Sequence, residues 1–189
     1  ASAASDVYKR QANMESKLFD LKGKTALITG GNGGIGFGMA VGLAEAGANI
    51  IIAARNKTKT DESISKLKGL GTNCEGIEVE VTDESSVQNM ISRSVEKFGN
   101  VDILINNAGI GIRKRPEEYT LTEWNKVVDI NLTGAFICSK EVYPHMKKNG
   151  GGKIINIGSM TSIFGLDWAV AYASSKGGIV QMTKTLAVS

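Results

Sequence analysis

Residues Lys24 to Gly36 read KTALITGGNGGIG, and this stretch decides the fold. Its first half, Lys24–Thr29, is a short apolar run rich in strand-forming residues, and glycines dominate its second half. A helical pattern follows through Ala46 and ends at Gly47, where a glycine is expected just past the helix. The stretch therefore predicts a strand, a tight glycine turn and a helix, in that order.

The rest of the chain repeats this alternation of strand and helix. Four further apolar runs read as strands, at residues 49–54, 75–81, 101–106 and 154–157. Helical patterns cover 57–69, 83–98 and 122–148, the last with Thr122 as its expected N-cap, and a final helix carries Tyr172. Strands that alternate with helices are typical of a parallel sheet with helices on its faces. We therefore predict an α/β fold, a three-layer, doubly wound Rossmann sheet with strand order 3-2-1-4-5.

The composition is that of one globular domain. The chain has 189 residues, 42% hydrophobic and 22% charged, and its net charge of +3 does not favour nucleic acid as a partner. Cys74 and Cys138 lie far apart and predict neither a disulfide framework nor a metal site. No apolar run approaches the roughly 18 residues of a membrane span. We expect residues 1–13 to be a disordered leader or assembly remnant and residues 14–189 to form one domain of a soluble cytoplasmic protein.

The glycine turn predicts a dinucleotide site. Glycines between a strand and a helix let the backbone approach a pyrophosphate, whose charge the helix N-terminus stabilises. The spacing is ambiguous, because the glycines fit three arrangements, one of them G-x-G-x-x-G at Gly31, Gly33 and Gly36. The alternative is a glycine-rich turn without a ligand. The loop residues expected to contact the cofactor are Gly30, Asn32, Gly33, Gly34, Ile35 and Gly36.

The end of the second strand bears on which dinucleotide binds. An acidic residue about 20 positions after the glycines would accept the ribose 2′-hydroxyl of NAD, but Ala54 stands there, followed by Arg55 and Asn56. A carboxylate would repel a 2′-phosphate, whereas a guanidinium binds one in a forked geometry. We therefore favour NADP(H), with NAD(H) as the second choice. The alternative is that Arg55 stacks on the adenine or points into water.

Three residues near the end of the chain form a candidate catalytic group. Tyr172 and Lys176 are four apart and share one face of the expected helix, so an ammonium lies beside a phenol. A neighbouring cation favours the phenolate and lowers a pKa that is ordinarily about 10, which suits general acid–base catalysis. Ser159, after the fifth strand, is placed to hydrogen-bond the same substrate oxygen. Such a pair also arises by chance, with the lysine on a solvated surface.

Together these motifs resemble the single-domain branch of the short-chain dehydrogenase/reductase family. The matching residues are Thr29–Gly36, Asn106-Asn107-Ala108-Gly109 after the fourth strand, Asn131 in the long helix, and Ser159, Tyr172 and Lys176. The resemblance implies hydride transfer between a nicotinamide and a carbonyl or carbinol carbon. It makes Tyr172 the proton donor or acceptor and Ser159 the group that stabilises the oxygen. It further implies that Lys176 holds the nicotinamide ribose and that Asn131 holds a relay water.

The resemblance also extends the cofactor contacts to Asn107, Ala108, Gly109, Tyr172 and Lys176. Members often carry Asp-Val near the end of the third strand, with the Asp at the adenine amino group. Glu80-Val81 stands here and keeps the acceptor on a longer arm. The chain stops at Ser189, before the family's last two strands and its substrate lid. We therefore expect a fragment, weakly active or inactive alone, of a protein that forms homodimers or homotetramers.

The substrate is the least determined part. Arg113, Lys114 and Arg115 lie where the family's substrate mouth begins, and three cations there would attract an acidic small molecule, although a charge run is more often a solvated face. With the start at Leu18–Lys24, this loop resembles members that act on sugar acids, such as gluconate 5-dehydrogenase and 2-deoxygluconate 3-dehydrogenase. A 3-oxoacyl-type or generic ketone reductase stays open. So do a non-catalytic nucleotide sensor and a non-redox isomerase or dehydratase of the same superfamily.

Overall fold

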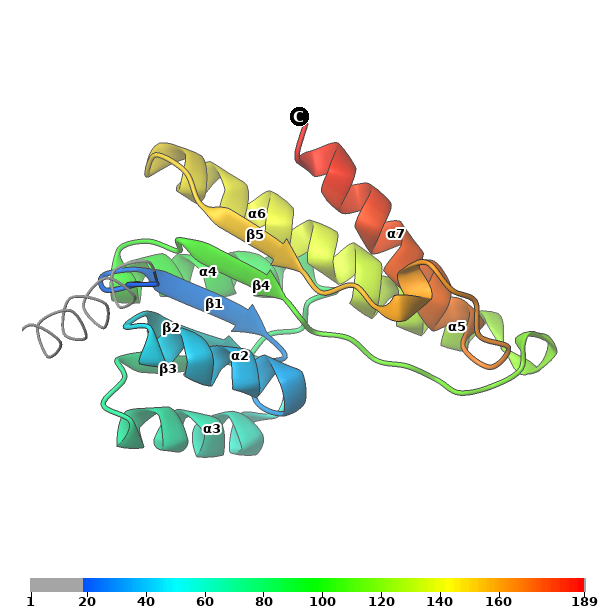
Figure 1. Cartoon of the computed structure of the whole chain (residues 1–189), viewed down its shortest axis with the longest axis horizontal. Coiled ribbons are helices and arrows are strands. Elements are labelled where there is room, and N and C mark those ends of the chain that lie inside the picture. The colour runs from blue at the N-terminus through cyan, green and yellow to red at the C-terminus, as the bar shows by residue number, and fades with distance from the viewer. Residues whose placement is uncertain (1–18, 189) are drawn as a thin grey trace, which may run out of the picture.

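The computed structural model describes residues 19–188, and at its centre lies a five-stranded parallel sheet (Figure 1). The strands are β1 (Thr25–Thr29), β2 (Asn49–Ala53), β3 (Cys74–Ile77), β4 (Ile103–Asn106) and β5 (Lys153–Asn156). They lie in the order β3-β2-β1-β4-β5, and each neighbouring pair is parallel. The predicted fold class and strand order are confirmed. The expected leader, residues 1–13, lies outside the described residues.

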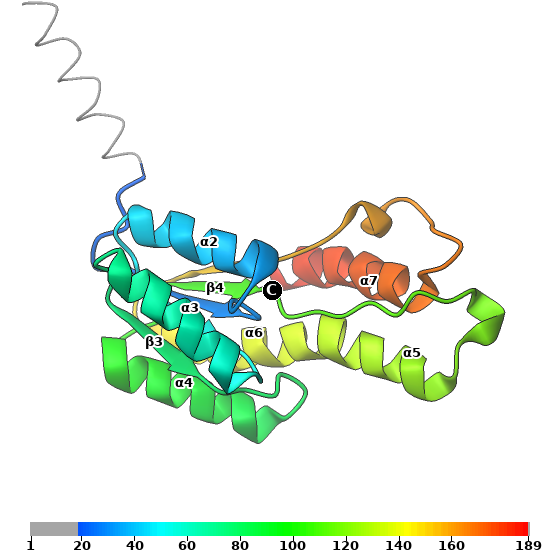
Figure 2. The ribbon, with the colours of Figure 1, turned by 90° about the horizontal axis from the view of Figure 1, so that it is seen from below.

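Helices cover both faces of this sheet, with α2 and α3 on one face and α4 and α6 on the other (Figure 2). The helices are α2 (Gly34–Glu45), α3 (Lys57–Gly69), α4 (Glu84–Phe98), α5 (Leu121–Val128), α6 (Gly134–Lys148) and α7 (Val170–Leu186). Successive residues of β1 point to opposite faces. Leu27 belongs to the core of α4 and α6, with Val87 and Val142, and Ala26 belongs to the core of α2, with Ala40. Burial on both faces is the reason that β1 reads as a continuous apolar run.

Local sequence signals set the helix ends. Gly47, with φ of 96°, follows the end of α2 as expected, and Asp83, where the predicted helix 83–98 starts, is the N-cap of α4. The expected cap at Thr122 is wrong, because the helix begins earlier. Thr120 Oγ1 accepts a hydrogen bond from the Glu123 backbone N–H at 3.2 Å, and the Glu123 carboxylate accepts from the Thr120 N–H at 3.0 Å. This reciprocal capping box follows from the T-x-x-E spacing, which was the signal for Thr120.

The single helix predicted over 122–148 is interrupted. A π-helical turn at Asp129–Thr133 joins α5 to α6 and carries Asn131, which is 1% exposed. After the turn, the backbone at Gly134 passes close to Val81, which follows the third strand. A Cβ on Gly134 would lie 2.8 Å from Val81 Cγ2. Turns of this kind are frequent at functional sites. Here the interruption brings the Asn131 side chain inward.

Strand β3 is shorter than the predicted 75–81. Its ladder with β2 ends at Ile77, and one further bond runs from Val79 N–H to the Ala54 carbonyl at 3.4 Å. Val79 and Val81 are nevertheless buried. Because Val79 and Val81 are apolar although they lie beyond the β2–β3 hydrogen-bond ladder, the sequence does not show where the strand ends. The segment after Ile77 becomes a wall of the pocket described below.

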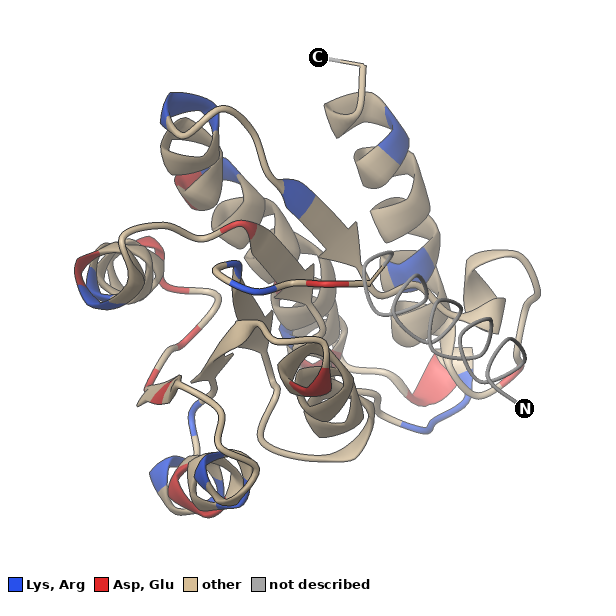
Figure 3. Cartoon of the chain, turned by 60° about the vertical axis from the view of Figure 1, so that its left-hand side comes forward, with Lys and Arg blue, Asp and Glu red and all other residues tan. Residues whose placement is uncertain are grey.

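Charged residues lie mainly on the helices and loops, and the strands are almost free of them (Figure 3). Helix α3, KTKTDESISKLKG, carries lysines towards both ends and the acidic pair Asp61 and Glu62 between them. Within residues 19–188, no helix is both long and apolar enough to cross a membrane.

Replacing Thr120 by Ala tests the corrected cap. Loss of the capping oxygen should lower the free energy of unfolding by about 1 kcal/mol, measured by chemical denaturation. Thr122→Ala is the matched control, since Thr122 is exposed within the first turn of α5 and is not the N-cap residue. It should change stability by no more than about 0.5 kcal/mol. A larger loss for Thr122→Ala than for Thr120→Ala would contradict the assignment.

Candidate active site and nucleotide pocket

The carboxyl ends of β1 and β4 are tied together by side chains. Thr29 Oγ1 accepts hydrogen bonds from the backbone N–H groups of Asn107 and Ala108, both at 3.1 Å. In return, the Asn107 amide donates to the carbonyls of Thr29 and Gly30, at 3.0 and 3.1 Å. Gly30 has φ of 64°, and a Cβ there would lie 3.0 Å from the Ala108 Cα. A glycine is therefore required for this close approach.

The N-terminus of α2 is open to a ligand. Its N-cap residue, Gly33, supplies no side-chain hydrogen bond. A Cβ on Gly33 or Gly34 would meet nothing within 4 Å, so no side chain covers this end of the helix. Exposed N–H groups at a helix N-terminus favour an anion such as a pyrophosphate. The residues of the glycine turn thus fit the phosphates of a dinucleotide.

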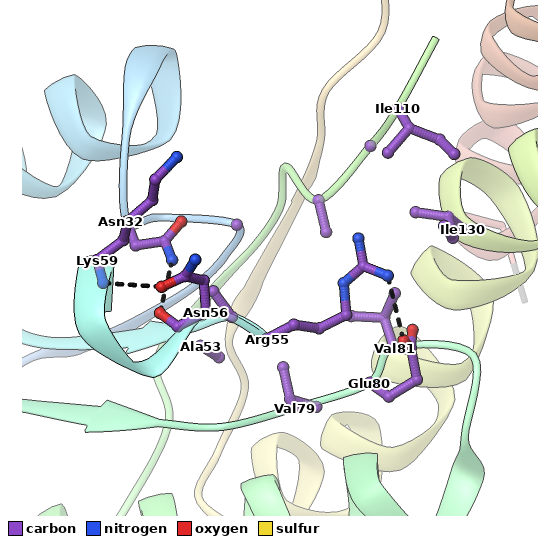
Figure 4. A pocket seen from close by; sticks show the side chains of 14 residues that line it. Asn32, Ala53, Arg55, Asn56, Lys59, Val79, Glu80, Val81, Ile110 and Ile130 are labelled. Carbon is purple, nitrogen blue, oxygen red and sulfur yellow. Dashed lines mark hydrogen bonds and ion pairs between the residues drawn. The ribbon is translucent and has the colours of Figure 1, made fainter. Parts of the chain in front are cut away.

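A pocket of about 240 Å³ opens beside this turn (Figure 4). Eight expected cofactor residues line it: Gly30, Asn32, Arg55, Asn56, Glu80, Val81, Ala108 and Gly109. Six further lining residues were not expected: Ala53, Ala54, Lys59, Val79, Ile110 and Ile130. The other expected contacts lie outside its lining: Gly33, Gly34, Ile35, Gly36, Asn107, Tyr172 and Lys176. The apolar members give part of the pocket an apolar lining, as small-molecule sites commonly have.

Four polar residues of this pocket, Asn32, Arg55, Asn56 and Glu80, already have partners. Arg55 Nη1 lies 3.5 Å from a carboxylate oxygen of Glu80. Asn56 caps α3, where its side-chain oxygen accepts from the Lys59 backbone N–H at 2.9 Å. Asn32 donates to the Asn56 carbonyl at 3.3 Å. Asn32 and Asn56 therefore shape the pocket as well as lining it.

Ser159 and Tyr172 line a second hollow of about 470 Å³. Ser159 Oγ accepts from the Thr161 backbone N–H at 3.2 Å, which leaves its own hydrogen available for a ligand. Loop residues connect the two pockets, since Gly109 and Ile110 line the first and the next two residues line the second. The predicted pair of Ser159 and Tyr172 is thus brought to one hollow beside the nucleotide pocket.

Lys176 lies behind Tyr172 and is 4% exposed. Its Nζ is 5.7 Å from the centre of the Tyr172 ring and donates to the Ile157 carbonyl at 2.6 Å. Burial lowers the pKa of Lys176 from its ordinary value, because desolvation penalises the charged form. The alternative of a solvated surface lysine is therefore excluded.

Asn131 links the loop between the pockets to the helix that carries Tyr172. Its amide oxygen accepts from Ile110 N–H at 2.8 Å, and its amide nitrogen donates to the Ile110 carbonyl at 2.9 Å and to Ser175 Oγ at 3.0 Å. Ser175 Oγ in turn donates to the Tyr172 carbonyl at 2.7 Å. The Asn131 side chain is largely used by these bonds, so it positions the loop rather than standing free.

The cations of the loop that follows differ in their surroundings. Arg113 lines the second hollow, with its guanidinium carbon 4.9 Å from the centre of the Trp168 ring. Lys114 instead forms an ion pair with Glu123 at 2.6 Å, and that hydrogen bond is the main cause that lowers the pKa of Glu123 to about 2. Arg115 does not line the hollow. Of the three cations expected at the substrate mouth, Arg113 is thus the one that lines the second hollow.

A parallel sheet of this strand order, with an open glycine turn at its carboxyl edge, defines a Rossmann-like fold. The chain belongs to the short chain dehydrogenase family, which matches residues 24–189. Binding of NAD(P) is typical of this family.

Several relatives match along most of the chain. It is 41% identical to a 2-dehydro-3-deoxy-D-gluconate 5-dehydrogenase of Formosa agariphila, with 92% of this chain and 66% of that protein covered. It is also 41% identical to an uncharacterized oxidoreductase of Thermotoga maritima, over 89% of this chain and 66% of that one. A crystal structure provisionally assigned as a gluconate dehydrogenase from Agrobacterium tumefaciens has a TM-score of 0.86 and 40% identity, with 90% and 67% covered. The chain thus spans about two thirds of the length of these relatives.

Replacing Gly36 by Ala tests the tie between β1 and β4. The added Cβ would lie 2.5 Å from Asn107 Nδ2 and 2.7 Å from the Gly30 carbonyl oxygen. Because both groups are fixed, we expect a loss of about 1–3 kcal/mol in the free energy of unfolding, measured by chemical denaturation.

Gly38→Ala is the matched control in the same helix. A Cβ on Gly38 meets nothing within 4 Å, so this change should instead stabilise the protein by about 0.5–1 kcal/mol through the higher helix propensity of alanine. If the two variants gained or lost stability equally, the tight approach at Gly36 would be disproved.

Proposed function

We propose that the protein is an oxidoreductase that transfers a hydride between a nicotinamide cofactor and a carbonyl or secondary alcohol. The observation that carries the proposal is that Ser159 and Tyr172 line one hollow that adjoins the nucleotide pocket, with Lys176 buried beside the tyrosine ring. The names of the relatives, among them dehydrogenases, support the same reaction class. A nucleotide sensor would not need a tyrosine and a desolvated lysine beside an open hollow.

The bound cofactor would supply or accept the hydride, and the protein would manage the proton and the substrate oxygen. Tyr172 would donate a proton to that oxygen during reduction and take it back during oxidation. The Ser159 hydroxyl would hydrogen-bond the same oxygen, because its acceptor side is used by Thr161 N–H. Lys176, at 5.7 Å from the tyrosine ring, would favour the phenolate electrostatically. Asn131 would hold the intervening loop against α7.

The cofactor we favour is NADP(H), with NAD(H) as the second choice. Arg55 and Lys59 both line the nucleotide pocket, and Ala54 stands where an NAD-type carboxylate would lie. A guanidinium and an ammonium in one pocket favour a ligand with an additional phosphate.

The substrate we favour is a sugar acid. Arg113 is the cation that lines the second hollow, where its guanidinium lies over the Trp168 ring. The relatives named 2-dehydro-3-deoxy-D-gluconate 5-dehydrogenase point to the same substrate class. The apolar residues Met160 and Leu166 in the same hollow favour, as the second candidate, a 3-oxoacyl-type or generic ketone reductase.

Assembly into a homodimer or homotetramer belongs to the same proposal. Large apolar side chains of α5 and α6 are exposed, namely Leu121, Phe136 and Tyr143. An exposed apolar set of this kind on adjoining helices is suited to contact with a second copy.

Replacing Tyr172 by Phe tests the reaction. The change removes the hydroxyl and keeps the ring, so kcat should fall by about 10²–10⁴-fold, the usual contribution of a general acid–base group. The measurement is the absorbance of the reduced nicotinamide with a panel of ketones and sugar acids. Nucleotide affinity should stay within about threefold of the parent, since the phenol lies outside the nucleotide pocket. Unchanged turnover would refute the proposed mechanism.

Replacing Arg113 by Ala tests the substrate class. If the guanidinium binds a carboxylate, KM for a sugar acid should rise by about tenfold or more, while KM for a neutral sugar changes little. Arg115→Ala removes the same charge outside the hollow and should leave both KM values within about twofold. Equal effects of Arg113→Ala on acidic and neutral substrates would favour the generic ketone reductase.

A further inference from the structure

The cation expected to bind a 2′-phosphate is paired within its own pocket. Arg55 Nη1 lies 3.5 Å from Glu80 Oε2, and both residues line the nucleotide pocket. In Figure 4 the Arg55 side chain runs away from Asn56 and Lys59, toward Glu80 and Ile130. A ligand phosphate and the Glu80 carboxylate would therefore compete for the same guanidinium.

The Glu80 carboxylate is fixed from its other side. Its Oε1 accepts hydrogen bonds from Thr82 Oγ1 at 3.1 Å and from Thr82 N–H at 3.4 Å. The Glu80 backbone N–H donates to Ser86 Oγ at 3.0 Å. These bonds leave Oε2 directed at Arg55. The position of the Glu80 carboxylate is therefore fixed by hydrogen bonds that do not involve Arg55.

We propose that Glu80 is a specificity-determining residue, whose carboxylate competes with a 2′-phosphate for Arg55 and so restrains the preference for NADP(H). The inference rests on the nucleotide site of the proposed function. A phosphate monoester carries about −1.5 to −2 charges at neutral pH, so the nearby carboxylate repels it as well as occupying its partner. Both effects act only on a nucleotide that carries the 2′-phosphate. A contact of Glu80 with the adenine would affect both nucleotides equally.

The size of the effect follows from the exposure of the pair. The side chain of Arg55 is 59% exposed and that of Glu80 is 40% exposed. Solvent screens such pairs, and exposed ion pairs contribute at most about 1 kcal/mol, so the competition is worth about fivefold in affinity. Lys59, on the opposite side of the pocket, has no ion pair within residues 19–188 and can meet a phosphate independently of Glu80. Glu80 would therefore tune the preference rather than create it.

The test compares two ligands that differ only in the phosphate of interest, adenosine 5′-monophosphate and adenosine 2′,5′-bisphosphate. Dissociation constants are measured by calorimetry for the parent, Glu80→Gln, Arg55→Gln and the double variant. Glutamine keeps an oxygen for Thr82, removes the negative charge and replaces the oxygen that faces Arg55 by an NH2 group. Glu80→Gln should improve the affinity ratio for the bisphosphate by about fivefold. In the Arg55→Gln background the same change should improve it by less than about twofold.

Glu78→Gln is the matched control for net charge, because Glu78 lines a different hollow, with Lys57 and Arg93. It should leave the ratio unchanged. An unaltered ratio in Glu80→Gln, or an equal gain with and without Arg55, would overturn the inference while leaving the proposed oxidoreductase intact. If neither nucleotide bound the parent, both the inference and the proposed nucleotide site would fail. A turnover unaffected by Tyr172→Phe would count against the reaction alone.

Discussion

The hydrogen bonds between the ends of β1 and β4 are the constraint on which the rest of the site depends. Thr29 and Asn107 exchange bonds through both side chains and backbone, and the Asn107 amide also reaches the Gly30 carbonyl. This exchange fixes the glycine turn relative to the loop that follows β4. Strand order reverses at this point, between β1 and β4, which is where open α/β sheets bind their ligands. The pocket is thus a consequence of how two neighbouring strands end.

A second series of hydrogen bonds connects the loop after β4 to the helix that carries Tyr172. Asn131 binds both the N–H and the carbonyl of Ile110 and reaches Ser175, which bonds the Tyr172 carbonyl. The loop that separates the two hollows is therefore attached to α7 by polar contacts in a part-buried region. Buried polar networks of this kind fix one arrangement because each broken bond leaves an unpaired group. The π-helical turn is the local distortion that lets Asn131 reach Ile110.

The sequence predicted what depends on local pattern and strand order. The apolar runs of β1 and β2, the open turn at Gly33, and the shared hollow of Ser159 and Tyr172 all follow from residue type, spacing and the parallel sheet. It did not predict that Lys59 lines the nucleotide pocket, because the sequence places Lys59 in a charged helix where lysines usually face solvent. Only the packing of α3 beside the glycine turn brings Lys59 to the pocket. Nor did it predict the pair of Arg55 and Glu80, because 25 residues separate them and only the β2–β3 arrangement brings them together.

Incomplete satisfaction of polar groups separates the functional regions from the core. Within residues 19–188, the bond to the Ile157 carbonyl is the one that Lys176 Nζ donates, although an ammonium has three hydrogens and the residue is almost fully buried. The first N–H groups of α2 likewise have no side-chain cap, whereas Asp83 caps α4 and Thr120 caps α5. Burying a lysine and leaving a helix end uncapped both reduce stability. Both departures lie at the carboxyl edge of the sheet, where a ligand can complete the missing bonds, and this coincidence links the fold to the proposed chemistry more firmly than any single residue does.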